Sequence, residues 1–307
     1  MAGTRIPEKK QRSPLQSSSH LLRCRRDLEC HQPTPACMKA FLRWAGSKKQ
    51  LLPILETYWD GNGTYYEPFA GSSCLFFHIE PRRGVLGDIN RELIQTLRGV
   101  RDNPKSIVSI LKRFSPVRAE YNKLREFSPA ELGKSERAAR FIFLNHHSFN
   151  GLYRTNAAGR FNVPFGRHKV KRAINFEVLG QASTLLKRAR LLNDDFEATV
   201  QSAKRGDFVY MDPPYFSSTR RIFGEYGPRT FGSADMLRLS RCLVKLHNRG
   251  VKFVVSYLYS TESRAIFSRW SVRRIRIRRN IAGFCSARRG AYELLACNFG
   301  PDGTLLS

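Results

Sequence analysis

Residues 208–215 read Phe-Val-Tyr-Met-Asp-Pro-Pro-Tyr. The apolar run at 208–211 follows the turn residues Gly206-Asp207, a pattern typical of a buried strand. The strand must end at Pro213, because two consecutive prolines remove two of the N–H donors that a strand ladder needs. Asp212 and Tyr215 are therefore expected at the carboxyl end of a strand. In an open α/β sheet, ligands bind at that edge.

The residue types at 212–215 suggest a particular chemistry. A rigidly held carboxylate and backbone carbonyl can accept both hydrogens of an exocyclic amino group, while an aromatic ring stacks on the base that carries it. This arrangement suits methylation of the amino group of adenine or cytosine. The alternative is a carboxylate that caps a helix after a tight turn.

Composition points to a polyanionic partner. The chain has 307 residues, 41% of them hydrophobic, and can bury the core of one large or two smaller domains. Its formal charge is +28, from 53 Lys and Arg against 25 Asp and Glu. A protein of a membrane surface is the alternative, but no basic amphipathic anchor is evident and no apolar run approaches the roughly 20 residues of a spanning helix.

The cysteines and the N-terminal segment indicate an intracellular protein without a metal site. Seven cysteines without paired spacing favour a reducing compartment, so we expect a cytoplasmic protein. Residues 1–37 show no helical or strand period and are predicted to be a disordered basic tail. The spacing of Cys24, Cys30, His31 and Cys37 fits no metal site. A chain that starts at Met38 is expected to be fully functional.

A nucleoside cofactor is predicted from residues 65–90. A strand at Tyr65-Tyr66 leads into a turn containing Gly71 and then an apolar helix. A second strand, residues 84–87, ends at Asp88. An acid at that place commonly accepts hydrogen bonds from ribose hydroxyls. ATP is not expected, because the chain contains no phosphate-binding loop of the Gly-Lys-Ser/Thr type.

Two further segments favour nucleic acid as the partner. After a helical region at about 91–140, residues 145–167 interleave Asn, Arg and aromatic side chains around Gly159, which suggests a groove-reading hairpin. Residues 273–279 alternate partly between Arg and Ile, which predicts a strand with a cationic face, and Arg288 and Arg289 follow. Phosphate contact is favoured over a solvated face, given the net charge.

Together these stretches resemble the Dam-type (D12 class, alpha group) DNA adenine-N6 methyltransferases, from about Phe41 to about Phe299. Five motifs occur in that family's order, namely Phe41-Leu-Arg-Trp-Ala-Gly-Ser-Lys48, Glu67-Pro-Phe-Ala-Gly-Ser-Ser73, Gly87-Asp-Ile-Asn90, the pair Phe149-Asn-Gly-Leu-Tyr-Arg154 with Gly159-Arg-Phe-Asn-Val-Pro-Phe-Gly-Arg167, and Asp212-Pro-Pro-Tyr215.

The resemblance implies an α/β fold, a Rossmann-like S-adenosylmethionine-dependent methyltransferase domain with an inserted, mostly helical target-recognition domain that carries a β-hairpin. The catalytic domain would comprise residues 38–92 and 174–307, and the recognition domain residues 93–173. The methyl donor would be S-adenosylmethionine, with no metal. The partner would be double-stranded DNA, methylated by a monomer at GATC or a close relative of that site, with the target adenine flipped out.

Site residues are carried over by position. The resemblance implies a catalytic motif of Asp212, Pro213, Pro214 and Tyr215. It implies a cofactor site of Trp44, Lys48, Phe69, Gly71, Asp88, Asp195, Phe196 and Asp212. For DNA it implies a wedge at Phe149, a guanine reader at Arg154, and supporting contacts from Asn150, Asn156, Pro164 and Arg167, to which the basic loop adds Arg288 and Arg289.

Two positions depart from the family pattern. Ser73 stands where the cofactor loop usually has a second glycine, and Tyr257 where members often have asparagine. A catalytically weak or inactive DNA-binding relative is therefore one alternative. Another is an amino-methyltransferase that acts on RNA or on cytosine N4, because the motif at 212–215 serves amino groups generally.

Overall fold

The computed structural model describes residues 38–156, 159–166, 174–215, 231–277 and 291–306. Contacts divide the chain into two units, Met1–Ala36 and Cys37–Ser307, and the fold described here belongs to the second unit. The predicted tail and residues 167, 288 and 289 lie outside the described residues.

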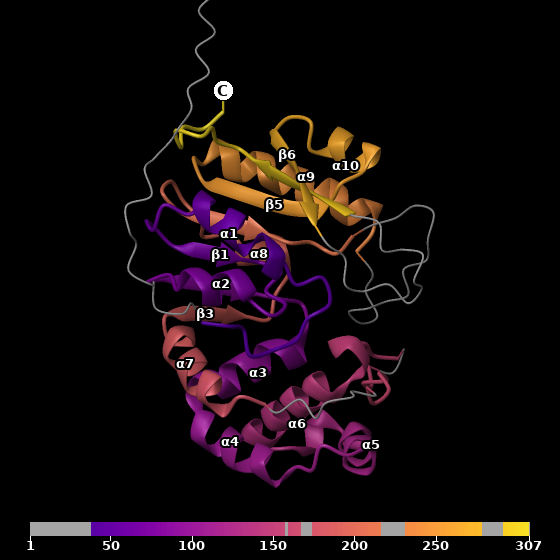
Figure 1. The fold of residues 1–307 in the computed structure, drawn as a ribbon. Helices are drawn as coiled ribbons and strands as arrows, with labels where there is room; N and C mark the ends of the chain where they lie inside the picture. Colours follow the sequence, from indigo (N-terminus) through magenta and orange to yellow (C-terminus); the bar gives the residue numbers. More distant parts are fainter. Residues whose placement is uncertain (1–37, 157–158, 167–173, 216–230, 278–290, 307) are drawn as a thin grey trace, which may run out of the picture. The chain divides into compact units, whose positions relative to one another are not determined.

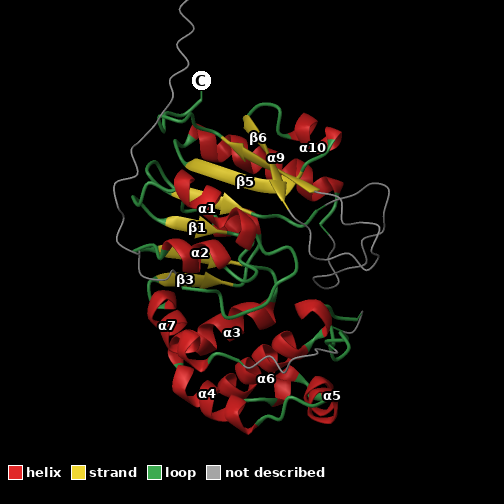
Figure 2. Ribbon diagram, viewed as in Figure 1, coloured by secondary structure: helices red, strands yellow, loops and turns green. Residues whose placement is uncertain are grey.

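A seven-stranded sheet organises the described chain, with the strand order β3-β2-β1-β4-β5-β7-β6 (Figures 1 and 2). Neighbouring strands from β3 to β5 pair in parallel, and β7 is antiparallel to both β5 and β6. The strands are β1 (Tyr65–Glu67), β2 (Gly84–Gly87), β3 (Ala189–Leu192), β4 (Phe208–Met211), β5 (Lys252–Leu258), β6 (Ser271–Ile277) and β7 (Ala291–Cys297).

The order of the strands reverses between β1 and β4, which lie side by side although more than 140 residues separate them in sequence. Ligands of open α/β sheets bind outside the carboxyl ends of the strands at such a switch point. The segments that follow β1 and β4, beginning at Pro68 and Asp212, therefore meet at one place.

Helices supply the crossovers that parallel strands require. They are α1 (Leu52–Leu55), α2 (Cys74–Ile79), α3 (Arg91–Asp102), α4 (Pro104–Arg113), α5 (Arg118–Glu126), α6 (Lys134–His147), α7 (Phe176–Leu186), α8 (Phe196–Thr199), α9 (Ser233–Asn248) and α10 (Thr261–Ile266), with short 3-10 turns at Lys49–Leu51, Glu56–Tyr58, Pro129–Glu131 and Phe149–Gly151. Of these described helices, none is long and apolar enough to cross a membrane.

Polar side chains set where several helices begin. The side-chain oxygen of Asn90 accepts a hydrogen bond from Leu93 N at 3.1 Å at the start of α3. Asn175 and Asp195 cap α7 and α8 in the same way. These are preferred N-cap residues, because a short side chain satisfies N–H groups that the helix leaves unpaired.

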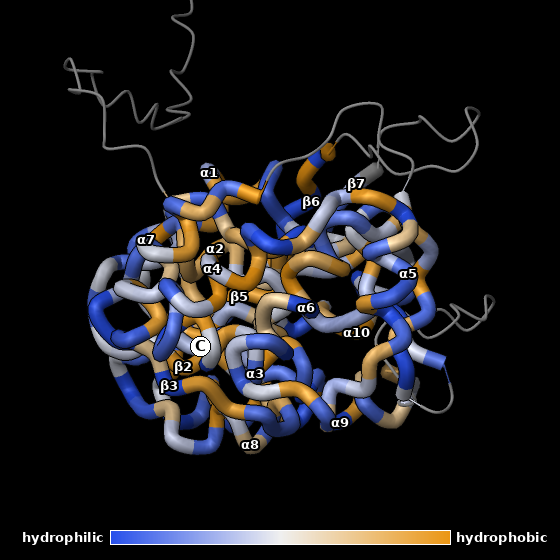
Figure 3. The backbone as a smooth tube through the Cα atoms, turned by 90° about the horizontal axis from the view of Figure 1, so that it is seen from below, coloured by the Kyte–Doolittle hydropathy of each residue, from blue (hydrophilic) through white to orange (hydrophobic). Residues whose placement is uncertain are grey.

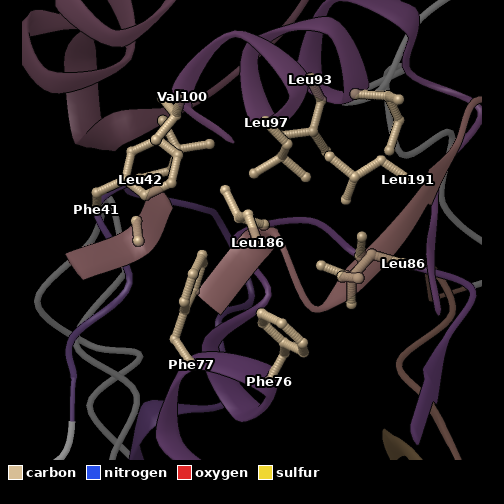
Figure 4. Packing of buried hydrophobic residues seen from close by; sticks show 14 of the residues in the cluster. Phe41, Leu42, Phe76, Phe77, Leu86, Leu93, Leu97, Val100, Leu186 and Leu191 are labelled. Atoms are coloured by element: carbon tan, nitrogen blue, oxygen red, sulfur yellow. The ribbon is translucent and has the colours of Figure 1, made fainter. Parts of the chain in front are cut away.

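The sheet separates two hydrophobic cores. In β4, Phe208 and Tyr210 face one core while Val209 and Met211 face the other, as the period of two requires. Figure 4 shows part of the first core, where Leu86 and Leu191 of the sheet approach Leu93 and Leu97 of α3. Both faces of the strand are buried, which confirms the prediction that the apolar run before Asp212 is a buried strand.

The helices α3 to α6 lie together on the β3 side of the sheet (Figure 1). Their core is continuous with the sheet, because Leu86 of β2 and Tyr121 of α5 belong to one buried cluster. In Figure 3, hydrophobic segments gather in the middle of the view, and hydrophilic segments make up much of its rim. The predicted domain boundaries at 93 and 173 remain predictions.

In the described residues around Gly159, isolated bridges link two antiparallel segments. Isolated antiparallel bridges link Thr155 to Phe161 and Ser148 to Phe165. Asn162 N also donates to Arg154 O at 3.0 Å. The segments thus run antiparallel, but no strand is assigned in their described residues, and the β-hairpin remains a prediction.

Candidate active site

Asp212 follows β4 directly and has one oxygen held by two donors. Lys48 Nζ lies 2.6 Å from Asp212 Oδ1, and Ser256 Oγ of β5 donates to the same oxygen at 3.0 Å. Because the Ser256 hydroxyl donates its hydrogen bond to Asp212, the hydroxyl of Tyr210, whose oxygen is 2.9 Å from Ser256 Oγ, must be the donor to Ser256. Within the described part of the chain no donor reaches Oδ2, so a substrate could bind this second oxygen.

Lys48 keeps its charge inside the protein. It is only 6% exposed, and burial alone would lower the pKa of its ammonium group. The carboxylates of Asp212 and Glu293 outweigh that effect, and the pKa of Lys48 lies above its ordinary value. Its Nζ also lies 5.1 Å from the ring centroid of Tyr215. The Lys48 ammonium group therefore contacts two residues of the predicted catalytic motif, Asp212 and Tyr215.

Tyr215 is held from two faces of the sheet. Its hydroxyl lies 2.8 and 3.0 Å from the two carboxylate oxygens of Glu293, which is buried in β7. The ring of Tyr257 meets it edge-on at 5.2 Å between centroids. Pro213 is buried and Pro214 partly buried between Asp212 and Tyr215. The aromatic ring is thus fixed beside the carboxylate that precedes it.

Asp88, at the end of β2, holds the loop that follows β1. Its Oδ2 accepts from Gly71 N at 3.1 Å and its Oδ1 from Asn90 N at 2.8 Å. Desolvation raises the pKa of Asp88 to about 6, although both N–H groups act in the opposite direction. Gly71 has a φ of 47°, and a Cβ there would come within 2.9 Å of Trp44 Cδ1. The loop therefore needs glycine at this position.

Phe69 and Phe196 form a third cluster, and we call their stacked rings the apolar corner. Phe69 stacks on Phe196 with centroids 5.3 Å apart, and the Arg238 guanidinium of α9 lies 4.9 Å from the centroid of the Phe196 ring. Arg238 Nη2 is 2.6 Å from Asp195 Oδ1 and 2.8 Å from Glu197 Oε2. The predicted cofactor residues Phe69, Asp195 and Phe196 are thus brought together.

The residues predicted to bind DNA lie on the segments around Gly159. Phe149 is 51% exposed, and Asn150 has a φ of 54°, in the left-handed region. Arg154 Nε donates to Asn162 Oδ1 at 2.9 Å. Asn156 and Pro164 are exposed, and Pro164 O accepts from Phe149 N at 2.9 Å. The other three predicted DNA contacts, at 167, 288 and 289, lie outside the described residues.

The N-terminal loop connects these regions. Trp44 stacks on Tyr153 with centroids 5.9 Å apart and an interplanar angle of 15°. Arg43 N donates to Asn145 Oδ1 at 2.8 Å, and Asn145 Nδ2 donates back to Arg43 O at 2.6 Å. A residue predicted to contact the cofactor is thus packed against the residue before Arg154.

Three residues with direct contacts to the site were missed by sequence reasoning, namely Ser256, Glu293 and Arg238. A signal existed for Glu293, since it is a lone acid inside the apolar strand Ala-Tyr-Glu-Leu-Leu-Ala-Cys. Such an acid needs a buried partner. The described residues include no group of three or more His, Cys, Asp or Glu side chains that could hold a metal ion.

The chain is similar to known proteins over most of its length. Residues 44–281 match the family model of the D12 class N6 adenine-specific DNA methyltransferases. The type II methyltransferase M1.LlaDCHI of Lactococcus lactis subsp. cremoris is 31% identical over 273 residues, which cover 86% of this chain and 96% of that protein. The type II methyltransferase M.MjaIII of Methanocaldococcus jannaschii is 31% identical over 290 residues, covering 85% and 99%.

The DNA adenine methylase of Escherichia coli strain K12 is 30% identical over 267 residues, covering 84% of this chain and 94% of that protein. The family model spans more than half of the chain and includes every described residue named for the site above except Arg43 and Glu293. The predicted resemblance is therefore confirmed, and the chain belongs to the D12 class of N6 adenine-specific DNA methyltransferases.

Proposed function

We propose that this chain transfers a methyl group from S-adenosylmethionine to N6 of a flipped-out adenine in duplex DNA, at GATC or a closely related site. One observation carries the proposal. Asp212 has Oδ1 fixed by Lys48 and Ser256, directly beside a Tyr215 ring that Glu293 holds in place. This is the geometry that an amino group on a stacked base requires.

Methyltransferases of this family use S-adenosylmethionine, and the residues at the site fit it. Ser47 Oγ and Asn90 Nδ2, on the two loops beside Trp44 and Asp88, are buried, and each can make a further hydrogen bond. Asp88 would receive the ribose hydroxyls, and Phe69 and Phe196 would form an apolar wall for the base. The bound cofactor supplies an electrophilic methyl group.

The protein's own part in the reaction is positioning. The amino nitrogen of adenine is a poor nucleophile, because its lone pair is delocalised into the ring. Asp212 and the Pro213 carbonyl would accept hydrogen bonds from the two N–H groups of the amino nitrogen and so orient its lone pair, while Tyr215 stacks on the base. Stacking is worth roughly 1–3 kcal/mol and offsets part of the few kcal/mol that flipping costs. Orientation supplies most of the acceleration.

Sequence readout would come from the segments around Gly159. The exposed Phe149 would fill the space that the flipped base leaves. Arg154 would bind O6 and N7 of a guanine. The hydrogen bond that its Nε donates to Asn162 Oδ1 would orient the guanidinium group for this contact. Asn150, Asn156 and Pro164 lie on the same segments and would complete the readout.

Methyl transfer from labelled S-adenosylmethionine tests the proposal. One duplex carries GATC, a second has its adenine replaced, and a third oligonucleotide is single-stranded with cytosine in place of the adenine. Label on the first duplex alone is the expected result. Label on both duplexes would keep the chemistry but remove the assignment of Arg154, and label on the third would favour an amino-methyltransferase of another specificity. No label with retained specific binding would indicate an inactive relative.

A further inference from the structure

Two exposed arginines, an exposed tyrosine and a partly buried tyrosine form a surface where β5, β7 and β6 run side by side. Tyr259 N, just past the end of β5, donates to Tyr292 O of β7 at 3.1 Å, and Tyr292 pairs in register with Arg276 of β6. Arg274 lies two residues before Arg276 and so on the same face of the sheet. We call these four residues the arginine–tyrosine face.

Arg274 is held between the two rings. Its Cζ lies 4.5 Å from the ring centroid of Tyr292 and 5.5 Å from that of Tyr259. Both arginines are exposed, and Tyr292 is 37% exposed. No ion pair to either arginine occurs among the described residues. Stacking fixes the plane of a guanidinium but leaves the N–H donors at its edge for a phosphate.

This face adjoins the proposed base-stacking residue. Tyr257 of β5 and Arg274 of β6 both pair in register with Leu294 of β7, so the three side chains share one face. The ring of Tyr257 contacts Tyr215, 5.2 Å between centroids. A nucleotide stacked on Tyr215 would therefore have its neighbours in the strand near the arginine–tyrosine face.

We propose that the arginine–tyrosine face binds the sugar–phosphate backbone of duplex DNA next to the flipped adenine. The inference rests on the proposed function, because it takes duplex DNA as the substrate. Charge complementarity supports it, since the chain carries a formal charge of +28. Such a contact positions the duplex without reading its sequence.

The salt dependence of DNA binding tests the proposal. The association constant of the full chain for a fluorescent duplex, with and without GATC, is measured by anisotropy over a range of KCl concentrations. Each phosphate contact contributes about 0.9 to the slope of log K against log salt. We expect Arg274→Gln and Arg276→Gln each to reduce the slope by about 1, the double variant by about 2, and Arg274→Lys to keep it.

Arg269→Gln is the matched control. Arg269 is also exposed, its Cζ lies 5.4 Å from the Trp270 ring, and it precedes the opposite end of β6. It should leave the slope unchanged. The loss in the double variant should be equal for both duplexes, so that the ratio of specific to non-specific affinity is preserved.

A double variant with the wild-type slope would overturn the proposal, as would a loss confined to the GATC duplex. The first result, found with normal methyl transfer, would refute this surface while leaving the proposed function intact. A wild-type chain that binds neither duplex would refute both. A reduced slope in a chain without methyl transfer would support the face and refute catalysis.

Discussion

At Asp212, a single carboxylate oxygen carries the contacts to Lys48 and Ser256. Asp212→Asn preserves the volume of the side chain but places an amide where an amino hydrogen must be accepted. We expect turnover to fall at least about 100-fold, the scale of losing one positioned polar group. Single-turnover methylation measures this, with DNA affinity and thermal unfolding as controls. Turnover near that of the wild type would contradict the assignment of Asp212.

Glu293 is expected to act through the hydroxyl of Tyr215. Both Glu293→Gln and Tyr215→Phe alter this one hydrogen bond, so each should lower turnover about tenfold, and the double variant should lose no more than the worse single variant. The readout is a double-mutant cycle on turnover together with the fluorescence of 2-aminopurine at the target base. Additive losses would mean that Glu293 acts on Lys48 or the fold instead.

Glu67 links pH to stability. Desolvation raises its pKa to about 8, although the Tyr65 hydroxyl donates to Glu67 Oε2 at 2.9 Å. The unfolded chain releases this proton near pH 4.5, the ordinary pKa of a glutamate, whereas the folded chain keeps it to about pH 8. The folded state binds more protons in that window, so the free energy of unfolding should fall as pH rises through it.

Glu67→Gln removes this titration, and at pH 8 it should raise the free energy of unfolding by roughly 4 kcal/mol relative to the wild type, because about 1.36 kcal/mol is lost for each pH unit between the two pKa values. Urea unfolding at pH 5 and pH 8 measures the difference, which should shrink at the lower pH. An equal difference at both pH values would show that Glu67 is ionised throughout.

Ser73 stands where the family pattern usually has glycine, and its local structure explains how a side chain is tolerated there. Its φ is 50°, in the left-handed region where glycine is favoured, and its side chain is buried. The hydroxyl donates to Ala70 O at 3.3 Å, within the same turn. The added atoms are thus accommodated inside the loop, at the price of backbone strain.

Among the elements, α9 supports the apolar corner through one side chain. Arg238 binds Asp195 and Glu197 and covers Phe196, so Arg238→Gln should loosen the proposed cofactor pocket without changing the proposed DNA contacts. Since the side chain is 37% exposed, we expect only a three- to tenfold loss of cofactor affinity, or about 1 kcal/mol. Calorimetry on the full chain measures it.

Arg241→Gln is the control for Arg238. It lies one turn further along α9 and is exposed, and it should leave cofactor affinity unchanged. A loss of DNA affinity in Arg238→Gln at constant cofactor affinity would contradict the assignment of α9 to the pocket.

For the whole molecule, the parallel part of the sheet was predictable because its motifs coincide with strand ends. Asp88 and Asp212 each follow a buried apolar run, and the edge at which both lie follows from the rule for open sheets. The helical region after β2 was equally visible in the spacing of its apolar residues.

The contacts inside the site could not be predicted. Tyr215 and Glu293 are 78 residues apart, and Asp195 and Arg238 are 43 apart, so no local pattern links them. The contact between Tyr215 and Glu293 depends on the antiparallel insertion of β7 beside β5, which propensity does not specify. The segments around Gly159 were predicted as a hairpin from their turn, and the described residues form isolated bridges.

The packing of Trp44 on Tyr153 has a thermodynamic consequence. Coupling of the two proposed sites through this contact would make cofactor change DNA affinity, and DNA must then change cofactor affinity by the same factor. We expect both factors to be greater than one, and Tyr153→Ala to bring both toward one. Dissociation constants for each ligand, with and without the other, measure them. Discrimination between DNA sites would then be a property of the protein with cofactor bound. The concentration of cofactor would therefore determine which DNA sites the protein occupies.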